Sequence, residues 1–230
     1  MNEMYKYHKS LRRACDAAKK RGVLAVLDIG TTKMACLVVQ FADSEIKAAN
    51  DGVASFAGYS NFRVIGAATI QSRGVKFGAI NSMAETEQAM LTVVHKAQKH
   101  AGVPVEHVIV SFAGAKPQSY GVAGEVEIAH GTITNNDIGR VLQSCEMPKF
   151  GENRTVLHAQ PVNFYVDHKP SIADPRGMAG NRLGTDMHVV TVDDDVLSNI
   201  AHCVERCQLE LAGVASSAYV AARSSLREDV

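Results

Sequence analysis

A short polar segment, Asp28-Ile-Gly-Thr-Thr-Lys33, separates two apolar stretches near the start of the chain. Gly30 in a tight turn would let the backbone approach a phosphate closely, and successive backbone N–H groups in such a turn favour anions. The hydroxyls of Thr31 and Thr32 would add donors, and Lys33 a compact positive charge. Asp28 could hold Mg²⁺, which prefers one or two carboxylates plus waters. The segment predicts a phosphate site; by spacing alone, an ordinary hairpin with a polar tip fits it as well.

The elements around this segment predict the fold that positions it. Residues 23–29 and 34–41 are nearly continuous apolar runs, typical of buried strands joined by the short loop. A third strand is expected at 63–70, a helix at 84–100 and a fourth strand at 108–112. The order strand, strand, strand, helix, strand is how each half of the actin-like, ribonuclease-H-type α/β fold begins. The periodicity alone does not separate this fold from other mixed α/β folds.

A different pattern follows. A strand over 120–130, a short helix over 135–144 capped by Asn135 or Asn136, and an extended segment over 155–167 precede a loop rich in proline and glycine. This predicts a small strand–helix–strand–strand module inserted into the first domain.

The first pattern then returns. We expect a strand over 187–192, a helix over 196–211, a short strand at 214–215 and a last helix over 216–226. Asp193-Asp-Asp195 precedes the first of these helices, where N-capping and the helix dipole explain acidic residues better than a metal site does.

Composition excludes several classes of protein. Lys and Arg together number 24, as do Asp and Glu, which argues against a dedicated nucleic-acid binder. No apolar run is long enough for a membrane-spanning helix. The odd number of cysteines, five, and the absence of a secretory signal favour a reduced, cytoplasmic protein. Cys203 and Cys207, with His202 beside them, are interpreted as part of a buried helix face, because a zinc site would need more ligands.

The first 21 residues are basic, with apolar residues at helical spacing. They could form an amphipathic helix that touches anionic lipid or an acidic partner. Because the apolar face is small, we interpret the segment as a solvated, partly helical tail. Residues 42–61 are interpreted as a surface insertion.

Several segments, in the same order along the chain, resemble FtsA, the actin-like bacterial division protein family. The first is the phosphate loop with its flanking strands, Val26–Val39. Alone it would also fit sugar kinases and Hsp70-like chaperones, but the likeness extends over about residues 22–230. The other segments that carry it are Ile65-Gly66, Ser72–Gly74, Val156–Pro161, Asn163–Asp167, Asp174–Gly180, His188–Thr191, Val204–Cys207 and Ala212–Ser217.

The resemblance implies an incomplete actin-like domain, 22–112 and 189–230, after the basic extension 1–21. It implies that 113–188 is an inserted SHS2-type α+β domain that contacts other division proteins and further copies of the protein. It also implies ATP and Mg²⁺ as cofactors. The family's first phosphate motif falls on Asp28, Gly30, Thr31, Thr32 and Lys33, with Asp28 toward Mg²⁺.

The family links FtsZ filaments to the cytoplasmic face of the inner membrane. Its second phosphate loop, adenine-binding part, FtsZ-binding subdomain and C-terminal membrane helix have no counterpart here, which implies an N-terminal half. One loop provides about two or three charge-assisted hydrogen bonds, roughly 1.5–3 kcal/mol each, whereas a micromolar site needs about 8 kcal/mol. We therefore expect ATP binding of millimolar strength or weaker, and no catalysis. The alternatives are a kinase or hydrolase half of the same superfamily, an isolated interaction module, and an inactive truncated product.

Overall fold

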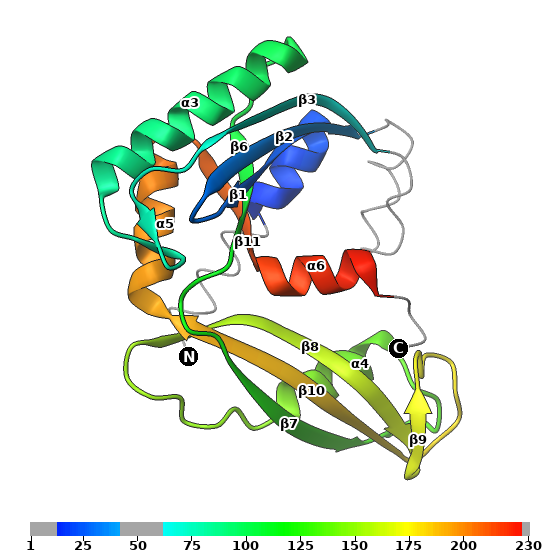
Figure 1. Ribbon diagram of the computed structural model, residues 1–230. Coiled ribbons are helices and arrows are strands. Elements are labelled where there is room, and N and C mark those ends of the chain that lie inside the picture. Colours follow the sequence, from blue (N-terminus) through cyan, green and yellow to red (C-terminus); the bar gives the residue numbers. More distant parts are fainter. Residues whose placement is uncertain (1–12, 42–61, 227–230) are drawn as a thin grey trace. The chain divides into compact units, whose positions relative to one another are not determined.

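The two apolar runs around the polar loop form adjacent antiparallel strands, β1 (Val23–Ile29) and β2 (Lys33–Phe41). The strand β3 (Phe62–Gln71) pairs antiparallel with β2. On the other side of β1, β6 (His107–Phe112) and β11 (Glu210–Ser216) continue the sheet in parallel, in the order β11-β6-β1-β2-β3 (Figure 1). The first three predicted strands and the predicted return of the chain to this domain therefore meet in one sheet.

A computed structural model describes residues 13–41 and 62–226. The chain divides into two compact units: unit 1 comprises Met1–Ala115 and Asp194–Val230, and unit 2 comprises Lys116–Asp193. The insertion expected at 42–61 and the first twelve residues of the basic extension lie outside the described residues.

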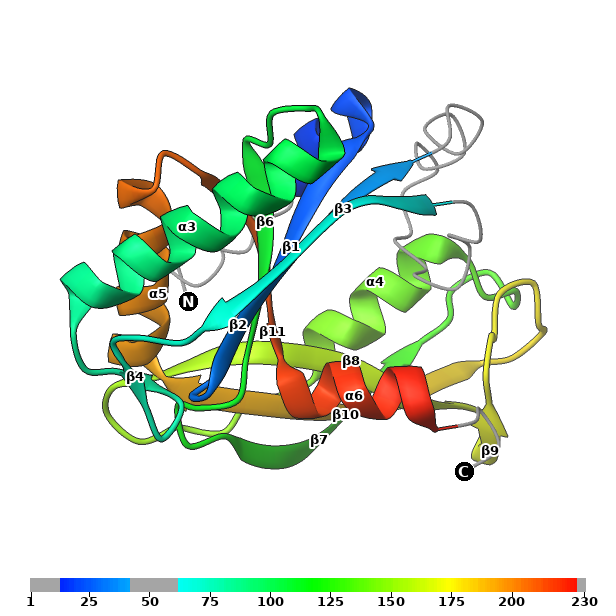
Figure 2. The same cartoon turned by 45° about the horizontal axis from the view of Figure 1, so that its top comes forward.

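Two helices, α3 (Met83–Ala101) and α5 (Asp194–Arg206), cover one face of the unit 1 sheet (Figures 1 and 2). The predicted helix over 84–100 corresponds to α3, which ends at Gly102 in the left-handed conformation. The side chains buried on this side are mainly aliphatic: Leu27, Met34, Val38, Met90, Val93, Val108, Val110 and Ile200. The core of unit 1 thus lies directly behind the strands that carry the polar loop.

The N-terminal segment differs from its interpretation as a tail. Residues 13–21 are helical, and Ala14 and Ala18 are buried against Leu24, Val39 and Ala212. These small side chains leave room for close packing on the sheet. The apolar stripe of this part of the extension is therefore used inside unit 1.

Unit 2 has one short strand more than the predicted strand–helix–strand–strand order, and its elements run strand–helix–strand–strand–strand along the chain. Its strands β7 (Gln118–Glu127), β8 (Arg154–Val166), β9 (Lys169–Ile172) and β10 (Arg182–Asp193) form a sheet in the order β7-β10-β8-β9. The helix α4 (Asn135–Ser144) packs on one face of it. The core between helix and sheet contains Ile128, Ile133, Val141, Phe164, Val166 and Leu183.

Two predicted boundaries are corrected. The strand expected at 187–192 in the first domain is the second half of β10, which pairs along its whole length with β7 or β8 of unit 2. Unit 2 therefore ends at Asp193, beyond the predicted boundary at 188. The helix expected over 196–211 ends at Arg206, because Gln208 adopts a positive φ of 59° and the chain then enters β11.

Smaller elements were also missed. The expected loop 72–78 and the residues after it contain a hairpin, β4 (Val75–Lys76) and β5 (Ala79–Ile80). The last helix, predicted over 216–226, is present as α6 (Ser217–Ser225). The short strand β9 lies within the proline- and glycine-rich stretch expected to be a loop.

The N-cap of α4 is Thr134, not Asn135 or Asn136. Its hydroxyl accepts a hydrogen bond from the Asp137 backbone N–H, and the Asp137 carboxylate accepts one from the Thr134 N–H. The Thr134 hydroxyl also donates to this carboxylate, at 2.6 Å. The reciprocal bonds form a capping box, which explains why the helix begins one residue after Thr134.

We expect Thr134→Ala to lower the free energy of unfolding by about 1 kcal/mol at neutral pH. Hydrogen bonds from Thr134, and then from Arg140, lower the pKa of Asp137. The stability linked to this carboxylate is present above its unfolded pKa and is lost as the pH falls through its lower folded pKa. Urea unfolding across this range should show the difference between the variant and the unchanged chain shrinking in acid. A difference that is constant or grows in acid would contradict this assignment.

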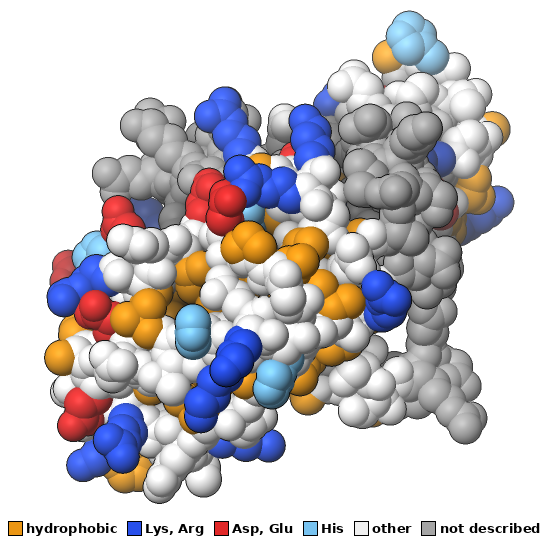
Figure 3. All heavy atoms as spheres, turned by 90° about the horizontal axis from the view of Figure 1, so that it is seen from above, with side chains coloured by type: hydrophobic (Ala, Val, Ile, Leu, Met, Phe, Trp, Pro, Cys, Tyr) orange, Lys and Arg blue, Asp and Glu red, His pale blue; other side chains and the backbone are white. Residues whose placement is uncertain are grey.

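None of the helices within the described ranges is long and apolar enough to cross a membrane. On the face of the molecule seen in Figure 3, basic, acidic and histidine side chains are interspersed with small apolar patches. Basic side chains are more prominent than acidic ones on this face.

Candidate functional site

The predicted phosphate loop is the turn between β1 and β2. The Gly30 N–H donates to the Lys33 carbonyl at 3.1 Å, which closes the turn. A Cβ at Gly30 would lie 2.8 Å from that carbonyl oxygen, so the turn in this form requires glycine. Thr31, Thr32 and Lys33 are exposed, and their polar groups are accessible to a ligand.

Asp28 and Lys33 lie on the same face of the sheet. Asp28 pairs with Ala35 across the strands, and Lys33 is two residues from Ala35, so the three side chains point to one side. Gly30, Thr31 and Thr32 lie between them in the chain. The structure therefore brings all five predicted residues to one end of β1 and β2.

Two serines that sequence reasoning missed complete this side of the site. The hydroxyl of Ser217, the first residue of α6, donates to the Asp28 carboxylate at 3.2 Å. The Ser111 hydroxyl in β6 lies 2.8 Å from the Ser217 hydroxyl. Because the Ser217 proton points to Asp28, Ser111 is the donor in the second bond. Asp28 is thus held by a chain of hydroxyls that leaves one carboxylate oxygen available for a water or a metal ion.

Thr31 connects the loop to two further segments. Its hydroxyl oxygen accepts a hydrogen bond from the Gly78 N–H, at 3.1 Å, in the β4–β5 hairpin. Gly78 packs backbone to backbone against Gly114, which follows β6: a Cβ at Gly114 would lie 1.9 Å from the Gly78 carbonyl oxygen. Three loops of unit 1 therefore meet at the C-terminal end of β1.

The residues around the turn between β1 and β2 provide some of the groups that would bind Mg²⁺ and phosphate. The Ser72 N–H donates to the Thr32 carbonyl, and the Ser72 hydroxyl beside it is buried without a hydrogen-bond partner in the described structure. Lys33 forms no ion pair with any described residue. Within the described ranges, no group of three metal-binding side chains exists, so Asp28 could hold a metal only together with phosphate oxygens and waters.

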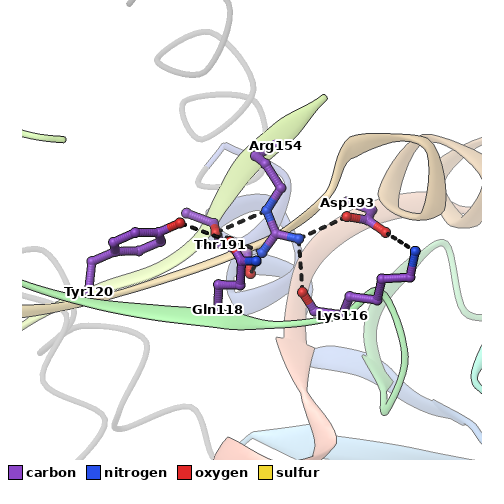
Figure 4. A network of polar contacts seen from close by, with 6 residues as sticks. All are labelled: Lys116, Gln118, Tyr120, Arg154, Thr191 and Asp193. Atoms are coloured by element: carbon purple, nitrogen blue, oxygen red, sulfur yellow. Dashed lines mark hydrogen bonds and ion pairs between the residues drawn. The ribbon is translucent and has the colours of Figure 1, made fainter. Parts of the chain in front are cut away.

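A second polar cluster lies where the chain enters and leaves unit 2 (Figure 4). The Arg154 guanidinium donates to the Thr191 carbonyl at 2.7 Å, to the Asp193 carboxylate at 2.8 Å and to the Lys116 carbonyl at 2.8 Å. It also donates to the Thr191 hydroxyl. Lys116 and Asp193, the first and last residues of unit 2, contact each other through an ion pair of 3.8 Å. Arg154 therefore connects the segment that enters unit 2 to the segment that leaves it.

The remaining candidates do not form sites. Cys203 and Cys207 are buried, in agreement with their interpretation as a helix face, and the Cys203 thiol contacts the Met83 sulfur. Burial raises the pKa of Cys207 to about 11 and that of Cys36 to about 12, so neither is a thiolate at neutral pH. Asp194 and Asp195 occupy the first turn of α5, where their charges suit the helix dipole.

Comparisons with known proteins support both units. Residues 114–191 match the family described as the SHS2 domain inserted in FTSA. The chain is 30% identical over 215 residues to the cell division protein FtsA of Rhizobium meliloti, which covers 92% of this chain and 47% of that protein. It is 32% identical over 204 residues to FtsA of Pseudomonas aeruginosa, with 88% and 45% covered. The chain spans about half the length of these curated relatives.

Among solved structures, the PilM-PilN type IV pilus biogenesis complex is similar with a TM-score of 0.53, at 10% identity, over 87% of this chain and 49% of that one. At this identity the likeness concerns the fold alone. The actin-like organisation with an inserted SHS2-type unit, expected from the sequence, is confirmed.

Proposed function

We propose that this chain, which is related over about nine tenths of its length to the N-terminal half of the cell division protein FtsA, acts in bacterial cell division as an actin-like adaptor. The observation that carries this proposal is the SHS2-type unit that is inserted into unit 1 between β6 and α5. The residues of the two units suit different roles. Unit 1 offers a phosphate loop, and unit 2 offers a sheet with one face that its own helix, α4, does not cover.

We assign nucleotide binding to unit 1. The backbone of Gly30 and the hydroxyls of Thr31 and Thr32 would donate to phosphate oxygens, and Lys33 would neutralise their charge. Asp28, held by Ser217, would orient the waters of Mg²⁺. When bound, Mg-ATP would supply the phosphate charge that these groups would bind and neutralise. We propose a binding switch and not a catalytic site: Asp28, the described carboxylate of this cluster, is assigned to Mg²⁺, and no motif supports a general base beside it.

Partner binding is assigned to unit 2, through which other division proteins and further copies would be recruited. We propose the link between FtsZ filaments and the cytoplasmic face of the inner membrane for the full-length relatives, of which this chain spans about half. A fluorescent fusion of the full chain should concentrate at the division site of bacteria that produce it. A fusion spread evenly through dividing cells, at normal abundance, would count against a role in division.

The nucleotide assignment predicts weak but specific binding. We expect Mg-ATP to bind the full chain with a dissociation constant of about 1 mM or weaker, because one loop supplies only a few charge-assisted bonds. Lys33→Ala should weaken binding at least about tenfold, the equivalent of one such bond. Amide chemical-shift changes of Thr31 and Thr32 during a titration would measure it.

Lys76→Ala is the matched control, since Lys76 is an exposed lysine on the neighbouring β4–β5 hairpin. Equal affinities of the two variants would refute the role of Lys33. Phosphate release that disappears in both Lys33→Ala and Asp28→Ala would show an enzyme instead of a switch.

A further inference from the structure

The two edges of the unit 2 sheet differ in how well they are protected. The edge strand β9 is four residues long, contains Lys169 and Pro170, and pairs irregularly with β8. These are features by which proteins prevent strand addition. The other edge strand, β7, spans ten residues from Gln118 to Glu127 and pairs with β10 without a register shift. It contains neither proline nor lysine.

The outer side of β7 has no partner within the described structure. From Gln118 to Val126, every described backbone hydrogen bond of β7 goes to β10. The Glu127 carbonyl, at the end of the strand, accepts from Arg140. In Figures 1 and 2, β7 lies at one edge of the unit 2 sheet. Roughly half of its N–H and C=O groups therefore form an open row that can pair with another strand.

Its side chains make this edge suited to close approach. The even-numbered residues face α4: Val126 packs on the core, and a Cβ at Gly124 would meet the Ser144 hydroxyl. The odd-numbered residues consequently lie on the other face. Among these, Ser119, Gly121 and Ala123 are small and exposed, and a Cβ at Gly121 would meet no atom within 4 Å.

Charges at the two ends select the orientation and the partner. Lys116, with 87% of its side chain exposed, precedes the strand, and exposed Glu127 ends it. If a second β7 adds antiparallel, Lys116 of each copy approaches Glu127 of the other, whereas a parallel copy would place like charges together. A two-fold axis makes both contacts at once, as in isologous dimers.

We infer that β7 is a self-association edge, through which two copies of this chain join their unit 2 sheets by antiparallel β7–β7 pairing. The inference rests on the proposed role of unit 2 as an interaction module and names its partner as a second copy. A two-fold axis perpendicular to the sheet preserves which face a residue lies on. Two residues that lie opposite each other across the pair therefore both have odd numbers or both have even numbers. At the centre of the pair, one residue of β7 lies opposite the same residue of the second copy.

Sedimentation equilibrium of the full chain between about 1 and 100 µM should show a monomer–dimer equilibrium. Gly121→Lys should weaken dimerisation at least about tenfold, because it places two like charges next to each other at the joined edges. Gly139→Lys is the control: it adds the same charge on α4, where a Cβ meets nothing within 4 Å. A chain that stays monomeric throughout, or a dimer equally sensitive to both substitutions, would overturn the proposal.

Cysteine crosslinking tests the geometry independently of stability. Opposed residues of antiparallel strands lie within the Cα separation that a disulfide spans. Oxidation should link Gly121→Cys either to itself or, in a mixture, to Ser119→Cys or Ala123→Cys, while Asn136→Cys on α4 should stay unlinked. Absence of links at all three β7 positions would overturn the proposal. Mg-ATP binding by such a monomeric chain would leave the nucleotide assignment intact, so the two failures are distinguishable.

Discussion

Replacement of Arg154 by methionine is expected to lower the free energy of unfolding by about 3 kcal/mol. The Arg154 side chain is 8% exposed, and its donors reach both ends of unit 2 at Lys116 and Asp193. Methionine keeps much of the volume but leaves the Asp193 carboxylate and the Thr191 carbonyl without their donor. An unsatisfied polar group in such a place costs more than the bond itself contributes.

Urea unfolding of the full chain and hydrogen exchange of β7 and β10 would measure the effect. The Lys116 and Thr191 segments should lose protection first, because Arg154 holds them. Arg154→Lys should recover only part of the loss, since an ammonium keeps the charge but not the planar fork. The control is Arg176→Met, which breaks an exposed pair with Asp174 and should lower the free energy of unfolding far less than the Arg154 replacement does. Equal losses for both variants would show that Arg154 is only another surface charge.

Local patterns were enough for much of the fold. The apolar runs around Asp28 and Lys33 predicted β1 and β2, and the spacing of Met90, Val93 and Val94 predicted α3. The predicted site residues also come together, since all five belong to one turn and its flanking strands. A site built from consecutive residues is visible in sequence because its geometry is local.

The missed parts depend on residues far apart in the chain. Nothing near Asp28 indicates that Ser217 will donate to it, because only the parallel pairing of β6 and β11 brings the two together. The second half of β10 would show the same apolar alternation in the sheet of either unit. Periodicity therefore could not show that this strand belongs to unit 2. Ala14 and Ala18 make a weak apolar face by themselves, and their burial depends on the open surface that the sheet presents.

The contact between Gly78 and Gly114 is another long-range feature, and it predicts the second large effect. We expect Gly114→Ala to lower the free energy of unfolding by about 2–3 kcal/mol. The new Cβ would lie 1.9 Å from the Gly78 carbonyl oxygen and 2.4 Å from its carbon, both of them backbone atoms. No side-chain rotation relieves such a clash, so the β4–β5 hairpin must move away from the loop after β6.

The movement would reach the phosphate loop. Gly78 donates to the Thr31 hydroxyl oxygen, and displacing the hairpin breaks this bond. The variant should therefore lose both stability, measured by thermal unfolding, and the shift changes of Thr31 with Mg-ATP. Gly139→Ala is the control, because its Cβ meets nothing within 4 Å and alanine favours the helix by about 0.5–1 kcal/mol.

Opposite signs for these two glycine-to-alanine changes would separate the backbone contact from a general effect of removing glycine. If Gly114→Ala unfolds like the unchanged chain and still binds through Thr31, the close approach of the two loops is wrong. A loss of stability with an unchanged response at Thr31 would instead place the hairpin outside the site. The pair of readouts thus tests whether the three loops act as one unit at the end of β1.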